Sequence, residues 1–106
     1  MEQINLKEGQ AVFQVGEQSN HVFLILHGVI GLYSPLDMTL PYQQLFQGDV
    51  FGETGLLKNK LRCAKALCLE ECEILRISKQ DFLKRLDSCD PLLRRLLNTK
   101  VNQSLK

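Results

Sequence analysis

Short runs in which apolar and polar residues alternate fill the first three-quarters of the chain, and turn-forming residues separate these runs. Alternation of this kind is typical of strands with one face on a core, and regularly spaced short strands favour an antiparallel sandwich, roll or barrel. The intervening Gly, Pro, Asn and Asp residues supply the backbone angles or local hydrogen bonds that turns need. We predict six strands, at 10–15, 22–26, 29–33, 42–46, 64–69 and 73–77.

The pattern changes at Ser78, after which apolar residues recur at the spacing of one helical face. Ser78 followed by Asp81 resembles a capping box, in which side chains satisfy the free N–H groups of a helix start. A helix is therefore predicted over about 79–86, in which Phe82, Leu83 and Leu86 fall on one helical face.

A second helix start follows at Asp90, because Asp is a favoured N-cap and Pro91 fits the first helical position. This start predicts a helix over about 91–98. We therefore expect a single domain of the mostly β class, an antiparallel β-roll or jelly roll over about 6–77. Two short helices follow the roll, and a polar tail ends the chain at 99–106.

Composition agrees with one soluble globular domain of 106 residues, with 44% hydrophobic and 24% charged residues and a net charge of +1. Twelve of the 13 basic residues follow residue 57, but none of their runs exceeds two residues, so we expect no direct nucleic-acid binding. The apolar run at 22–26 is too short to cross a membrane, and no signal peptide is indicated. We therefore expect a cytoplasmic protein that does not bind membranes.

Candidate chemistry concentrates at residues 51–57, FGETGLL, and at Arg62. Glycines around a short apolar turn let backbone N–H groups converge on an anion. The guanidinium of Arg62 matches a phosphate, whereas the carboxylate of Glu53 only accepts hydrogen bonds and therefore suits a hydroxyl. Together these residues predict a sugar-phosphate pocket. The alternative from the residues alone is a bulge glycine beside a surface ion pair worth about 0–1 kcal/mol.

This stretch resembles the phosphate-binding cassette of cyclic nucleotide-binding domains, which reads FGEx[AG]L followed by RxA at the same Glu-to-Arg spacing. Upstream, the chain is similar to the family pattern of turn glycines and an aromatic residue at Gly9, Gly16, Phe23 and Gly28. The similarity extends over about 6–97. It implies the β-roll fold and a regulatory module that binds cyclic AMP or cyclic GMP, with no other cofactor.

The resemblance also implies residue roles. Arg62 would pair with an exocyclic phosphate oxygen, Glu53 would accept from the ribose 2′-hydroxyl, and backbone N–H groups would bind the phosphate. The implied ligand-binding set is Gly52, Glu53, Thr54, Gly55, Arg62, Cys63 and Ala64. We expect Arg62 to be partly exposed without ligand, so that its loss leaves the fold nearly intact.

Departures from the family pattern concern specificity and output. Cys63 stands where guanine-selective members often have Ser or Thr, which implies a preference for cyclic AMP over cyclic GMP. Lys65 beside the cassette either attracts the anion or points to solvent. In the family the last helix covers the base, so the end of the helix at 91–98 is a lid candidate. It could equally be a homodimer face, or the contact to an effector domain or protein.

Three alternatives belong to other classes. A metal-dependent enzyme of cupin type shares the roll, but His21 and His27 lie about 20 Å apart at opposite ends of one predicted strand. The cysteines at positions 63, 68, 72 and 89 are poorly spaced for a metal and read as reduced thiols. We therefore expect neither a metal nor catalysis. The chain could also be a scaffold that no longer binds nucleotide, or the sensor part of a longer regulator.

Overall fold

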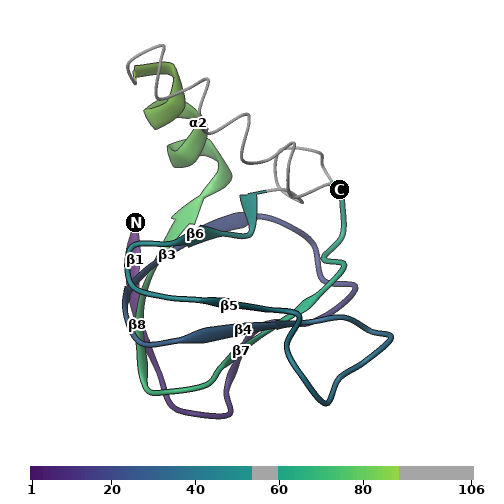
Figure 1. The fold of residues 1–106 in the computed structure, drawn as a ribbon. Helices are drawn as coiled ribbons and strands as arrows, with labels where there is room; N and C mark the ends of the chain where they lie inside the picture. Colours follow the sequence, from purple (N-terminus) through teal and green to yellow (C-terminus); the bar gives the residue numbers. More distant parts are fainter. Residues whose placement is uncertain (54–59, 89–106) are drawn as a thin grey trace.

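Two four-stranded antiparallel sheets face each other in the computed structural model, which describes residues 1–53 and 60–88 (Figure 1). The first sheet has the order β1-β8-β3-β6, with β1 at Glu2–Leu6, β8 at Cys72–Ser78, β3 at His21–His27 and β6 at Val50–Phe51. The second has the order β2-β7-β4-β5, with β2 at Ala11–Phe13, β7 at Lys65–Cys68, β4 at Ile30–Tyr33 and β5 at Gln43–Leu45.

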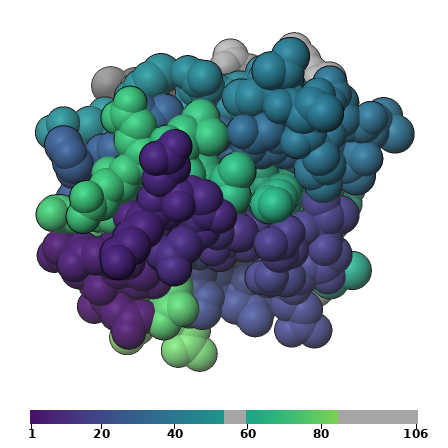
Figure 2. All heavy atoms as spheres, turned by 90° about the horizontal axis from the view of Figure 1, so that it is seen from below, coloured from purple at the N-terminus to yellow at the C-terminus, as the bar shows by residue number. Residues whose placement is uncertain are grey.

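Consecutive strands mostly belong to opposite sheets, so the chain crosses between the sheets at most of its turns. The longest pairing joins β3 to β8, from His21 opposite Ser78 to His27 opposite Glu73. β1 lies on the other side of β8, and Figure 2 shows the purple N-terminal residues beside the green residues of the second half of the chain. This arrangement is the β-roll that the strand spacing predicts.

Aromatic rings fill the middle of the core between the sheets. Phe23 and Phe51 stack with their ring centroids 5.2 Å apart, and Phe13 lies 5.9 and 6.1 Å from them. Branched side chains of the facing strands, among them Ile25 and Ile74, complete the same buried cluster. Each strand contributes every second residue to this core, which explains the alternating sequence pattern.

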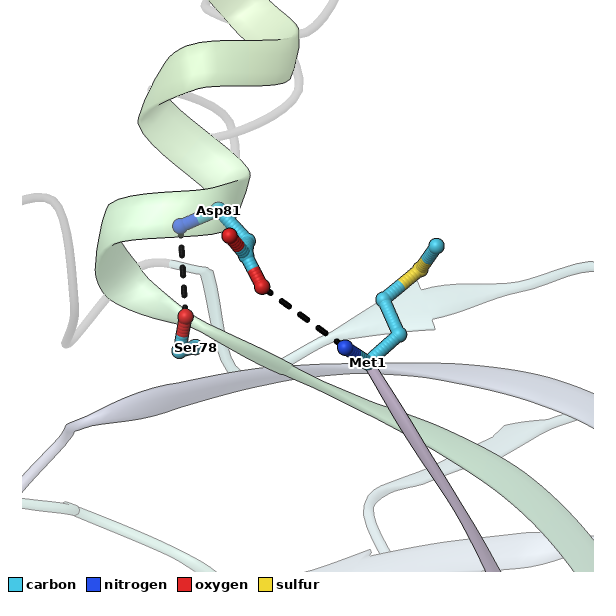
Figure 3. Close-up of polar contacts among 3 residues, drawn as sticks. All are labelled: Met1, Ser78 and Asp81. Atoms are coloured by element: carbon cyan, nitrogen blue, oxygen red, sulfur yellow. Dashed lines mark hydrogen bonds and ion pairs between the residues drawn. The ribbon is translucent and has the colours of Figure 1, made fainter.

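The helix α2, Lys79–Ser88, continues directly from β8 and begins with the predicted cap. The backbone N–H of Asp81 donates to Ser78 Oγ at 3.2 Å, and the Asp81 carboxylate lies 3.6 Å from the amino group of Met1 (Figure 3). Phe82 is buried against Val22. Leu83, on the same predicted helical face, is 38% exposed.

The six predicted strands are all present, with ends that differ by one or two residues. β1 and β6 were not predicted, and the roll starts at Glu2 rather than near residue 6. β1 is an edge strand with mostly exposed residues, and β6 has only two residues, so neither produces a clear apolar pattern. The helix predicted at 79–86 is confirmed, and the one at 91–98 lies outside the described residues.

In the part of the chain that the structure describes, no helix is long and apolar enough to cross a membrane.

Candidate functional site

The two ends of the predicted cassette meet at Arg62. Gly52 and Glu53 follow β6, whereas Arg62 to Ala64 precede β7 on the other sheet. Arg62 Nη1 donates to the Gly52 carbonyl at 2.7 Å, and Arg62 Nη2 donates to the His21 carbonyl at 2.6 Å. One guanidinium therefore joins the start of the cassette, its end and the first residue of β3.

The Arg62 side chain is buried, with 6% of the residue exposed. Its guanidinium carbon lies 4.2 Å from the centre of the Phe13 ring and 5.8 Å from that of Phe23. A cation over an aromatic face is attracted by the ring's negative face, more strongly where water is excluded. The expectation of a partly exposed Arg62 is therefore wrong, because two carbonyls and two rings replace the water around this cation.

The backbone of Arg62 is fixed as firmly as its side chain. The N–H of Arg62 donates to the Glu17 carbonyl at 2.8 Å, and the Arg62 carbonyl accepts from the Gly16 N–H at 2.8 Å. Gln18 and Leu61 form a β-bridge beside this pair. The loop between β2 and β3 thus holds the end of the cassette in place.

Burial lowers the pKa of the Arg62 guanidinium, and the negative charges of Glu17 and Glu53 oppose this shift. An arginine stays protonated under such conditions because its ordinary pKa is so high. Arg62 Nε is buried and has no hydrogen-bond partner within residues 1–53 and 60–88. The described residues therefore leave part of the donor capacity of this cation unused.

Gly52 is required by the same contact. Its φ angle is +86°, a region that side chains disfavour, and an added Cβ would lie 2.9 Å from Arg62 Nη1 and 3.2 Å from Phe23 Cδ2. Any other residue would displace the guanidinium or strain the turn. The glycine of the sequence motif thus makes room for the arginine of the same motif.

The remaining predicted residues have different environments. Glu53 is 7% exposed and close enough for its charge to act on Arg62, Ala64 is buried, and Cys63 is an exposed free thiol. Thr54 and Gly55 lie outside the described residues. The structure thus brings Gly52, Glu53 and Arg62 together, and Cys63 and Ala64 directly follow Arg62.

Sequence reasoning missed the partners of the guanidinium. His21 contributes its backbone carbonyl, which no side-chain pattern reveals, and Phe13 had been counted only as part of a strand. His21 and His27 stand at the two ends of β3, as expected. Within residues 1–53 and 60–88, no group of three or more His, Cys, Asp or Glu side chains could hold a metal ion.

A cavity of about 250 Å³ lies beside this site, between β1, β2, β3 and β8. Its described lining includes Arg62 and His21 but neither Gly52 nor Glu53. Burial, together with the charges of Arg76 and Arg62, lowers the pKa of His21 at this cavity. The imidazole is therefore neutral over more of the pH range than a free histidine.

The chain matches a known family. The family model "Cyclic nucleotide-binding domain" matches residues 3–89, and the chain belongs to this family. In that family the module is regulatory.

Individual relatives are distant. The cAMP-dependent protein kinase regulatory subunit of Dictyostelium discoideum is 24% identical over 110 residues, which cover 99% of this chain and 33% of that protein. The EAL enzyme Bd1971 in its cGMP-bound form is 24% identical, with a TM-score of 0.79 over 96% of this chain and 28% of the other. Cyclic AMP-bound PfPKA-R (141-441) has a TM-score of 0.77 over 98% and 36%. The chain thus spans about a third of these proteins, and the structural likeness shows the fold.

Replacing Arg62 by alanine should destabilise the fold by about 2–3 kcal/mol, because two carbonyls lose their donor and two rings lose the cation. Urea unfolding of the purified chain measures this loss. Arg76→Ala is the matched control, since Arg76 is a half-exposed arginine paired with Glu2 and should cost less than about 1 kcal/mol. Equal losses for the two variants would contradict a structural role of Arg62.

Proposed function

We propose that this chain binds a 3′,5′-cyclic nucleotide between the two ends of the cassette and acts as a regulatory module. The observation that carries this proposal is the contact of Arg62 with the Gly52 carbonyl beside buried Glu53, which gathers the three motif residues around one positive charge. Membership of the family supports the ligand class. The EAL enzyme Bd1971, which matches this fold over 28% of its chain, has been solved in a cAMP-bound and a cGMP-bound form.

The donor inventory of Arg62 suits a phosphate. A guanidinium has five N–H donors, and the contacts to Gly52 and His21 use one donor on each of its two Nη atoms. The remaining donors would pair with an exocyclic phosphate oxygen, at the strength of a charge-assisted hydrogen bond. Glu53, a carboxylate held close to this cation, would accept from the ribose 2′-hydroxyl. A cyclic nucleotide would thus contact both charged residues, Arg62 through its phosphate and Glu53 through its ribose.

We further propose that cyclic AMP is preferred over cyclic GMP. Cys63 directly follows Arg62 and is exposed. A hydroxyl at this position would bond the guanine 2-amino group, whereas a thiol is a weak donor and a weak acceptor. The loss of one neutral hydrogen bond corresponds to about a factor of two to ten in affinity.

The output is proposed to pass through α2. This helix follows β8 without a break, and its described contacts with the roll include the packing of Phe82 on Val22 and the contact of Asp81 with Met1 (Figure 3). We propose that ligand binding biases the position of the helix through these contacts. Since the chain spans a third of the kinase regulatory subunit, we place the regulated activity in another domain or protein.

Nucleotide binding should raise the melting temperature. At a ligand concentration near 100 times Kd, mass action adds about 2.7 kcal/mol, or several degrees to more than ten for a domain of this size. A melting scan with cyclic AMP and cyclic GMP measures the shift, and 5′-AMP, which lacks the cyclic diester, is the control. Equal melting temperatures with and without millimolar cyclic nucleotide would favour the scaffold reading.

The Glu53→Gln variant separates the two charged roles. It should weaken binding of cyclic AMP and leave binding of 2′-deoxy cyclic AMP unchanged, because the 2′-deoxy ligand has no hydroxyl from which the carboxylate could accept. Calorimetric titration of both ligands with both proteins gives the comparison.

Cys63→Thr tests the base preference. The variant should gain two- to tenfold affinity for cyclic GMP alone, since it restores a hydroxyl beside the guanine amino group. Paired titrations of the natural chain and the variant give the ratio. A natural chain that already prefers cyclic GMP, or an equal gain for both ligands, would show that the base is recognised elsewhere.

Hydrogen exchange across Lys79–Ser88 tests the helix output. Amide exchange should slow in α2 at saturating cyclic AMP, because the bound state would favour one docked position. The β3–β8 pairs, which are already hydrogen-bonded, are the internal control. Unchanged protection of α2 with bound nucleotide would leave a passive binder.

A further inference from the structure

Two cysteines lie at the connection between β7 and β8, where the chain crosses from one sheet to the other. Cys68 is the last residue of β7 and Cys72 is the first residue of β8. Both side chains are fully buried, whereas Glu70 and Glu71 between them are exposed. The two Sγ atoms are 2.9 Å apart. An S–S bond is about 2.05 Å long, so closing the bond requires only a small movement of the two sulfurs.

The two thiols compete for the same acceptor. Cys68 Sγ lies 2.5 Å and Cys72 Sγ 2.8 Å from the Glu70 carbonyl oxygen, and Cys72 Sγ lies 3.3 Å from the Val29 carbonyl. Each thiol carries one hydrogen, so the pair cannot satisfy all of these contacts together. The two sulfur atoms therefore lie against each other and against the same carbonyl, without a full set of hydrogen bonds.

Backbone contacts fix the position of both sulfurs. The Cys68 carbonyl accepts from Gly9 N–H at 2.8 Å, and its N–H donates to the Gln10 carbonyl at 2.8 Å. Gly28 packs so closely that an added Cβ would lie 2.7 Å from Cys72 Sγ. The connections β1–β2 and β7–β8 thus lie side by side, at the lower end of the roll in Figure 1, away from α2. The two sulfurs are therefore held together by the fold.

We propose that Cys68 and Cys72 form an oxidisable dithiol, which closes to an intrachain disulfide by exchange with a low-molecular-weight disulfide and ties β7 to β8. In the first step one protein thiolate attacks the small disulfide, whose S–S bond breaks, and one small thiolate leaves. The second protein thiol then loses its proton and attacks the protein sulfur of the mixed disulfide, and the second small thiolate leaves. Two protons and two electrons have moved from the protein to the small disulfide.

The burial of the pair determines how this exchange proceeds. Burial and the contact with Cys72 raise the pKa of Cys68 to about 12, which leaves little thiolate in the closed structure. Exchange therefore requires the turn at Glu70 and Glu71 to open and is slow in the native state. Exposed Cys63 is more accessible, but its reaction closes no ring.

Oxidation should change stability without changing nucleotide affinity. Arg62 precedes β7, whereas Cys68 is the last residue of this strand. None of the Arg62 contacts described above involves the β7–β8 turn. A disulfide that closes a five-residue loop restricts the unfolded chain and raises the melting temperature by several degrees. The inference is thus independent of the proposed ligand.

The test refolds the full chain from denaturant in buffers with oxidised or reduced glutathione, so that access to the buried thiols does not limit the outcome. After alkylation and trypsin digestion, Cys68 and Cys72 share the peptide 66–76, whereas Cys63 lies in the peptide 63–65. We expect the oxidised 66–76 peptide to be lighter by two hydrogens than the reduced, unalkylated peptide and to take up no alkylating reagent. The oxidised protein should melt several degrees higher, and dithiothreitol should reverse both changes.

Two sets of variants control the experiment. Cys63→Ser should keep the shift in melting temperature, whereas Cys72→Ala should lose it, with Cys68→Ala as the substitute if Cys72→Ala does not fold. The proposal would be overturned if protein refolded with oxidised glutathione regains its strand content but both thiols of peptide 66–76 still take up the alkylating reagent. Closure of the disulfide with loss of strand content would overturn it as well.

Discussion

The buried guanidinium of Arg62 is the interaction on which the site and the adjoining strands depend. This one cation donates hydrogen bonds to two backbone carbonyls, those of Gly52 and His21, and lies over the ring of Phe13. Without it, two carbonyls in a water-poor region would lack a donor, at a cost that exceeds that of most surface contacts. The residue that the motif assigns to a ligand therefore also holds two strands of the first sheet to the cassette.

This double use explains the composition around Arg62. Gly52 lacks a side chain because the guanidinium occupies that space, and the carboxylates of Glu17 and Glu53 offset the cost of burying its charge. The two carbonyls each accept one hydrogen bond and carry no net charge. A carboxylate in a bidentate ion pair would instead accept two parallel hydrogen bonds and neutralise the cation. A site built in this way keeps its cation firmly positioned.

Much of the fold could be predicted from the sequence, because six strands and α2 have clear periodicity or a capping signal. The edge strand β1 and the two-residue β6 could not, since the first is polar and the second is too short for a period. Gly52, Glu53 and Arg62 were predicted as a group from the motif and its resemblance to the family's phosphate-binding cassette. The burial of Arg62 was not, because it depends on a backbone carbonyl 41 residues away in the chain, which leaves no side-chain pattern.

The pairing of β1 with β8 has a consequence for how the chain reaches its fold. Glu2 lies opposite Arg76, so a central strand of the first sheet finds its neighbour at the very start of the chain. Contacts between residues so far apart in sequence form slowly, because a long loop must close before any pairing compensates for the lost entropy. During synthesis, β1 has no strand partner until residues 72–78 have left the ribosome, and β3 lacks its longest pairing until the same point. The edges of these two strands are thus open for that interval, which makes them available for wrong pairings.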